Sequence, residues 1–171
     1  MAVLPIVLAA DEDPVLVTKA IRVPRVDDTI RKLMDDMVET MIDAHGAGLA
    51  APQVGVPLRV IVLKVDNQVY QLANPEMARC EGEQTGMEGC LSVPGLIGEV
   101  TRCQRVVARG VNRHGKEIRV KGDGLLARAI QHEVDHLDGI LFTTKVNEGT
   151  LRRWDPADEA QAEALEGELV G

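Results

Sequence analysis

The strongest chemical signal in the sequence is the segment His132-Glu133-Val134-Asp135-His136. In a helix, residues four positions apart lie on one face, so the two imidazoles can reach one metal ion. Glu133, beside the first histidine, can then reach a water molecule on that metal. This arrangement is typical of a hydrolytic metal site. The alternative interpretation is two hydrogen-bonded histidines on a helix beside surface acids.

A catalytic divalent site typically offers three protein ligands and one open position, so a third ligand is required. No histidine follows His136, and the next glutamate is Glu148, which weakens the assignment of a zinc peptidase with a downstream third ligand. Upstream, Cys90 is the candidate. Gly89 before it permits close approach of the backbone, and Leu91 after it offers a peptide N–H beside the proposed metal.

A third segment, residues 46–53, combines small residues with one amide side chain. Its glycines close a predicted helix and no Lys-Ser or Lys-Thr follows, which excludes a phosphate-binding loop. Gln53 suits a pocket in which its amide N–H donates to an oxyanion. A helix-capping turn is the alternative interpretation.

Two amphipathic helices and several strands are predicted around these segments. Apolar residues recur at helical spacing over residues 28–45, and a second helix is expected from about Asp123 to a stop at Gly139. Strands are expected at residues 60–65 and 69–72, the second ending at Ala73-Asn74-Pro75.

Residues 80–98, rich in glycine, are expected to form a loop. Two further strands are expected within residues 99–120, with a turn at 112–115, and Phe142 is expected to begin a short extended piece. The predicted fold is α+β, with mainly antiparallel sheets packed around a central metal-carrying HExxH helix.

Composition bounds the remaining possibilities. The chain has 171 residues, of which 45% are hydrophobic and three are aromatic, so one domain is expected and base-stacking nucleic-acid platforms are not expected. The net charge is −8, but residues 155–171 carry six acids and no base, which leaves the rest close to neutral. Without a basic stripe, nucleic-acid and anionic-membrane binding are not expected. We predict a catalytic metallohydrolase domain over residues 1–154 and an acidic C-terminal tail over 155–171.

Three cysteines form an odd and sparse set, which argues against a disulfide framework. Cys80 and Cys103 are predicted to be small buried residues or free surface thiols. The N-terminal region has no basic segment before an apolar run, and no stretch approaches the ~18–20 apolar residues of a membrane span. The sequence therefore predicts a cytoplasmic protein.

Taken together, the three segments resemble the signature motifs of the peptide deformylases, Gly-x-Gly-Leu-Ala-Ala-x-Gln, Glu-Gly-Cys-Leu-Ser and Gln-His-Glu-x-Asp-His-Leu-x-Gly. They stand here at residues 46–53, 88–92 and 131–139, in the same order and matched at every fixed position. Two features depart from the family pattern. Leu96-Ile97 is apolar where a basic residue often lies near the substrate backbone, and the C-terminus is acidic where some bacterial members have a basic helix suited to the ribosome.

The resemblance implies removal of the N-formyl group from the initiating N-formylmethionine of nascent polypeptides, with release of formate. Cys90, His132 and His136 would hold one divalent metal ion, and the resemblance implies ferrous iron, with zinc, nickel or cobalt able to replace it. Hydroxide formed on the metal would attack the formyl carbonyl. Glu133 would act as general acid and base.

The oxyanion that develops would be stabilised by the Gln53 side chain and the Leu91 backbone N–H. Leu125 and Ala129, on the helical face that leads to the first histidine, are expected to line the methionine pocket. Other substrate contacts are expected at Gly46, Ala47, Gly48 and Gly89. The implied partners are N-formylmethionyl peptides, with transient proximity to ribosomes.

Charged residues near the motifs have more ordinary expectations. Glu88 is predicted to pair with Arg102 in a structural role. Arg128, one turn before His132, is predicted either at the mouth of the pocket or as a solvated helix arginine. Two alternative functions stay open: an HExxH endopeptidase, and a deformylase-like protein that binds metal without catalysis.

Overall fold

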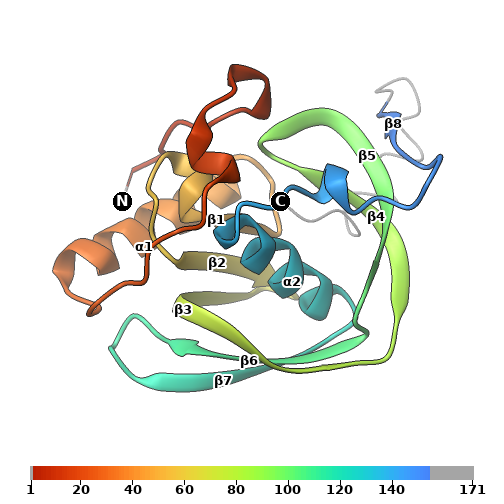
Figure 1. Cartoon of the computed structure of the whole chain (residues 1–171). Coiled ribbons are helices and arrows are strands. Elements are labelled where there is room, and N and C mark those ends of the chain that lie inside the picture. Colours follow the sequence, from red (N-terminus) through yellow and green to blue (C-terminus); the bar gives the residue numbers. More distant parts are fainter. Residues whose placement is uncertain (1, 155–171) are drawn as a thin grey trace.

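A computed structural model describes residues 2–154, which contain two α-helices and eight strands (Figure 1). The helices are α1 (Asp28–Asp43) and α2 (Leu125–Leu137). The strands are β1 (Gly48–Ala50), β2 (Val60–Val65), β3 (Gln68–Glu81), β4 (Gln84–Cys90), β5 (Val93–Arg102), β6 (Arg105–Val111), β7 (Glu117–Asp123) and β8 (Arg152–Arg153). Short 3₁₀ turns occupy Ala9–Asp11, Pro14–Val17, Ala51–Val54 and Phe142–Thr144.

The strands form two antiparallel sheets beside α2. One sheet has the order β1-β2-β3-β6-β7 and the other the order β4-β5-β8. Each pair of neighbouring strands in these sheets is antiparallel. In Figure 1, α2 runs through the middle of the molecule, with β6 and β7 below it and β4 and β5 beside it. The predicted α+β fold with a central HExxH helix is confirmed.

Apolar side chains hold α2 on the five-stranded sheet. Ala127, Ile130 and Leu137 of α2 are fully buried in one cluster with Leu63 of β2 and Leu72 of β3. Side chains alternate between the two faces of a strand, so the other residues of β2 face α1, which packs three buried methionines against them. The five-stranded sheet is therefore covered on both faces where the HExxH helix docks.

Residues 80–98 form most of β4 and β5 and not the predicted loop. Two of the glycines there, Gly86 and Gly98, are strand residues that make room for neighbouring side chains. A Cβ on Gly86 would lie 3.3 Å from Arg128 Nη2, and one on Gly98 would lie 2.5 Å from Val146 Cγ1. A glycine count alone does not distinguish such close contacts from turns.

The β2–β3 hairpin and the turn at residues 112–115 between β6 and β7 are confirmed. However, β3 does not end at Pro75 but continues to Glu81. Its pairing with β6 shifts register between Ala73 and Glu76, where Asn74 adopts a φ of 51°. Pro75 lies inside this irregularity, where proline is tolerated because the regular ladder is interrupted.

Cys80 and Cys103 form a disulfide with their Cα atoms 5.6 Å apart, so the prediction of free thiols at these positions is wrong. Cys80 lies near the end of β3 and Cys103 directly follows β5, although the two are 23 positions apart. Their proximity depends on strand register, which the sequence pattern does not provide. Among residues 2–154, Cys90 is the free cysteine.

Phe142 begins a 3₁₀ turn, not the extended piece that was predicted. The acidic segment 155–171 lies outside the described residues, so its separation from a catalytic domain over residues 1–154 stays a prediction. In the part of the chain that the structure describes, no helix has both the length and the apolar character needed to cross a membrane.

Candidate metal centre

Three buried side chains from two elements converge beside the C-terminal half of α2. Cys90 is the last residue of β4, and His132 and His136 lie one turn apart on α2. Cys90 Sγ lies 3.4 Å from His136 Nε2, which lies 3.2 Å from His132 Nε2. Tetrahedral sites with bond lengths of about 2.0–2.3 Å separate their ligand atoms by roughly 3.3–3.6 Å. The spacing of these donors therefore fits a transition-metal ion.

The protonation preferences of the donors also suit a cation. Burial, and then the negative charge of Glu133, raise the pKa of the Cys90 thiol to about 12. A divalent cation reverses this preference, because a thiol that coordinates a metal is deprotonated. Burial, and then the nearby His132, hold the pKa of His136 well below its usual value. His136 is therefore a neutral imidazole, the form that binds metals.

His132 is oriented by a carboxylate behind it. Its Nδ1 lies 2.8 Å from Glu88 Oε1, which accepts the Nδ1 proton and leaves the Nε2 lone pair facing the other donors. Burial alone raises the pKa of Glu88, but hydrogen bonds from Arg102 and His132 outweigh burial and lower it. The predicted Glu88–Arg102 pair is confirmed, with nitrogen–oxygen distances of 2.8 and 2.9 Å.

Glu133 is fully buried and neither of its carboxyl oxygens has a hydrogen-bond partner. Burial, and then repulsion from Glu88, raise its pKa well above the usual value. Gly48 of β1 makes room for it, because a Cβ at that position would lie 2.5 Å from Glu133 Oε2. An unpartnered carboxyl group with a raised pKa is suited to proton transfer near neutral pH.

The Gln53 side chain lies against the same group. Its Oε1 accepts the backbone N–H of Ala50 at 3.0 Å, so it belongs to the short turn after β1. Its Nε2 lies 3.6 Å from Cys90 Sγ and 3.2 Å from Ser92 Oγ. The turn thus presents the Gln53 amide N–H beside the proposed metal donors. Residues 46–53 therefore form a turn and also carry a candidate oxyanion donor, so the two interpretations are compatible.

The other predicted substrate residues lie in different surroundings. Gly46 lies against Leu91, because a Cβ there would come within 2.9 Å of the Leu91 side chain. Ala129 is fully buried in the core cluster under α2, and Leu125 packs against that cluster. Ala47 is half-buried and packs at the edge of the same cluster. Gly89 is buried beside Cys90. Their contacts with substrate stay predictions.

Sequence reasoning missed the role of Arg128. This residue is buried, so the solvated alternative is wrong, and its Nη1 lies 2.5 Å from Glu88 Oε2. A signal was present, because Arg128 and His132 are four positions apart and so share a face of α2. Their common partner on β4 was not visible in the sequence.

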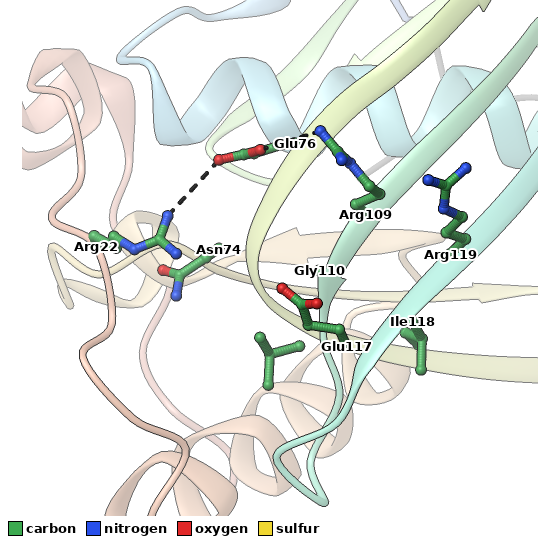
Figure 2. Close-up of a pocket in the computed structure, with 9 residues that line it drawn as sticks. Arg22, Asn74, Glu76, Arg109, Gly110, Glu117, Ile118 and Arg119 are labelled. Carbon is green, nitrogen blue, oxygen red and sulfur yellow. Dashed lines mark ion pairs between the residues drawn. The ribbon is translucent and has the colours of Figure 1, made fainter.

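A surface hollow of about 490 Å³ lies elsewhere, over β3, β6 and β7 (Figure 2). Glu76 forms exposed ion pairs there with Arg22 at 3.7 Å and Arg109 at 3.8 Å. None of the predicted metal or catalytic residues lines it. The hollow is therefore separate from the candidate metal centre.

An α+β fold with an HExxH helix, a cysteine third donor and a buried unpartnered glutamate defines the class of metal-dependent hydrolases. Comparison with known proteins identifies the family. Residues 3–152 match the family model described as polypeptide deformylase, and the chain belongs to this family.

Individual relatives agree with the family match. A peptide deformylase of Dehalococcoides mccartyi (strain CBDB1) is 48% identical over 157 residues, covering 90% of this chain and 94% of the relative. The crystal structure of peptide deformylase from Thermus thermophilus is 42% identical, with a TM-score of 0.80 over 97% of this chain and 95% of that one. The peptide deformylase from Ehrlichia chaffeensis in complex with actinonin is 36% identical, with a TM-score of 0.83 over 98% and 99%.

Proposed function

We propose that this chain is a metal-dependent peptide deformylase, which hydrolyses the formyl amide of N-formylmethionyl peptides to formate and a free amino terminus. The observation that carries the proposal is the convergence of Cys90, His132 and His136 beside the unpartnered carboxyl group of Glu133. Membership of the deformylase family supplies the substrate class.

The chain's own residues have distinct tasks in this proposal. When bound, the metal acidifies a water molecule and polarises the formyl carbonyl. Glu133 takes a proton from the attacking water and delivers it to the leaving amine nitrogen. Gln53 Nε2 and the Leu91 backbone N–H donate to the carbonyl oxygen as negative charge develops on it. Gly48 keeps space open for the Glu133 carboxyl group.

The identity of the metal is part of the proposal. One thiolate and two imidazoles suit iron, zinc, nickel or cobalt and disfavour magnesium and calcium. We infer ferrous iron as the physiological ion, from the resemblance to the family. A cytoplasmic location and transient proximity to ribosomes stay predictions. The Cys80–Cys103 disulfide removes one argument for the cytoplasm, where such bonds are rare.

The direct test measures formate released from formyl-Met-Ala peptides by protein loaded with ferrous iron under anaerobic conditions. We expect Glu133→Gln to lower kcat by about 10²–10⁴-fold while metal content is retained. Glu39→Gln is the matched control, because Glu39 on α1 also has a buried carboxyl oxygen without a partner. That variant should keep the wild-type rate.

Two results would contradict the proposal. Cleavage of internal peptide bonds without formate would support an endopeptidase. Absence of formate from the loaded wild type, with no change in Glu133→Gln, would support a metal-binding protein without catalysis.

A further inference from the structure

The proposed ligand set is divided between two parts of the fold. His132 and His136 belong to α2, whereas Cys90 belongs to β4 in the three-stranded sheet. Backbone geometry fixes the two histidines relative to each other, but it does not fix the cysteine relative to them. The geometry of the centre therefore depends on the side chains that join α2 to β4 and β5.

Arg128 makes this connection from the helix. Its side chain is 4% exposed, and Nη1 donates to Glu88 Oε2 at 2.5 Å and to the backbone oxygen of Val100 at 3.0 Å. The guanidinium lies against Gly86, where a Cβ would meet Nη2 at 3.3 Å. One helix side chain thus contacts both β4 and β5.

The partner of Arg128 also touches both halves of the ligand set. Glu88 lies two positions before Cys90 on β4, and its Oε1 holds the Nδ1 proton of His132 at 2.8 Å. Its Oε2 is shared by Arg128 and Arg102. The direction in which Arg128 pulls this carboxylate therefore affects the orientation of His132 and the path of the strand that ends at Cys90.

Stability alone does not account for an arginine at this position. The Nη2 atom of Arg128 is buried without a hydrogen-bond partner, which is a cost that an apolar side chain would avoid. Arg102 already neutralises Glu88 and makes the reciprocal connection, from β5 to Asp135 on α2 at 2.5 Å. Because Arg102 already balances the charge of Glu88, the main effect of the Arg128 guanidinium is to fix the orientation of the Glu88 carboxylate.

We propose that Arg128 is a positioning residue that sets the distance and angle between the Cys90 thiolate and the two imidazoles. It acts through Glu88 and does not touch the metal. This inference rests on the metal centre of the proposed function, but it does not require that the substrate be a formyl peptide.

The test compares Arg128→Met, Arg128→Lys and Arg59→Met with the wild type, each loaded with cobalt(II). Arg59 is the matched control, because it also anchors α2, through the Leu137 backbone oxygen at 2.9 Å and Asp138 at 3.1 Å, without contacting a ligand residue. The readouts are the visible cobalt spectrum, the rate of cobalt transfer to a chelator, and the Tm of each protein.

We expect Arg128→Met to release cobalt about 10–100-fold faster than the wild type, as is typical when a partner behind a metal ligand is lost. Its cobalt spectrum should show an altered thiolate-to-metal band, because the Cys90 geometry changes. Arg128→Lys should restore part of both properties. Arg59→Met should lower Tm and leave release rate and spectrum unchanged.

The proposal is overturned if Arg128→Met lowers Tm but keeps the wild-type spectrum and release rate, since Arg128 would then be merely structural. If that variant does not fold, Gly86→Ala provides the second measurement, because its Cβ pushes on the guanidinium. An altered spectrum in Gly86→Ala supports the proposal, and an unchanged one overturns it. Neither readout involves formate, so failure of the proposed activity is distinguishable from failure of this inference.

Discussion

The two faces of α2 are attached to the molecule by different forces. One face packs on the five-stranded sheet through apolar residues such as Ile130 and Leu137, which are fully buried. The other face contacts β4 and β5 through buried charges. Arg128 of α2 donates to Glu88 of β4, and Arg102 of β5 donates to Asp135 of α2. Apolar packing is non-directional, whereas charged hydrogen bonds hold their partners at fixed angles.

The metal centre depends on both faces of α2, but for different properties. The apolar face provides most of the favourable free energy, because each fully buried aliphatic side chain contributes about 1.5–3 kcal/mol. Buried ion pairs contribute little net stability, since desolvation offsets their attraction. They are nevertheless costly to break, and they lie where donors from two elements must meet. The charged face therefore governs geometry and the apolar face governs stability.

Two variants that damage the two faces of α2 by a similar amount separate stability from metal binding. Arg102→Met leaves Glu88 and Asp135 without their shared partner, and we expect a loss of about 3–5 kcal/mol in the free energy of unfolding. Ile130→Ala removes packing on the apolar face, with an expected loss of about 2–5 kcal/mol. Urea unfolding measures both, and metal analysis after dialysis measures retention.

Only Arg102→Met should also lose metal. If Ile130→Ala lost as much metal at equal residual stability, the assignment of geometry to the charged face would be wrong.

A second prediction concerns the disulfide that joins the two sheets. The covalent loop between Cys80 and Cys103 encloses all of β4 and all of β5, with a sequence separation of 23. Closing a loop of this length stabilises a protein by about 3 kcal/mol, mainly by restricting the unfolded chain. We expect the Cys80→Ser, Cys103→Ser double variant to lose about that much, measured by urea unfolding without reductant.

The metal centre of this double variant should be unchanged, because neither cysteine is among the donors. Addition of a dithiol reductant provides the control, since it should destabilise the wild type and leave the double variant unaffected. Equal stability of the two proteins without reductant would contradict the prediction.

The sequence was most informative where function depends on local spacing. The i, i+4 pair of His132 and His136 predicted the helix and half of the ligand set, because helical geometry alone places them together. Cys90 was found from the chemistry of its neighbours and from motif resemblance. The apolar periodicity of residues 28–45 and the apolar, mostly β-branched run at residues 60–65 likewise predicted correct elements.

Features that depend on register or on distant partners were not visible. Cys80 and Cys103 meet because β3 pairs with β6, and this register places Cys80 opposite Val106, three positions after Cys103. Gly86 signalled a loop in the sequence, but in the structure it accommodates the Arg128 guanidinium. Which distant strands pair, and in which register, cannot be read from a short stretch of residues, whereas the spacing of side chains along a helix can.

The smallest expected effect is in the pH dependence of the charged face. Glu88 has a lowered native pKa, because hydrogen bonds from Arg102 and His132 outweigh burial. In the unfolded chain a glutamate has a pKa of about 4.3. Its contribution to stability is therefore fully present above that value and is lost as pH falls toward the lower native pKa.

In metal-free protein, this difference should reduce the free energy of unfolding by about 1 kcal/mol between about pH 4.5 and pH 3.5, because one pKa unit corresponds to 1.36 kcal/mol. Glu88→Gln cannot titrate at this position and should lack this part of the dependence of unfolding free energy on pH, whatever its stability at neutral pH.

Ile130→Val, a change on the apolar face, is the control. It should lower the free energy of unfolding by a similar amount at every pH and keep the wild-type slope. The slopes of urea-derived unfolding free energies against pH decide the matter. Equal slopes for wild type and Glu88→Gln would mean that the hydrogen bonds from Arg102 and His132 do not lower the native pKa of Glu88.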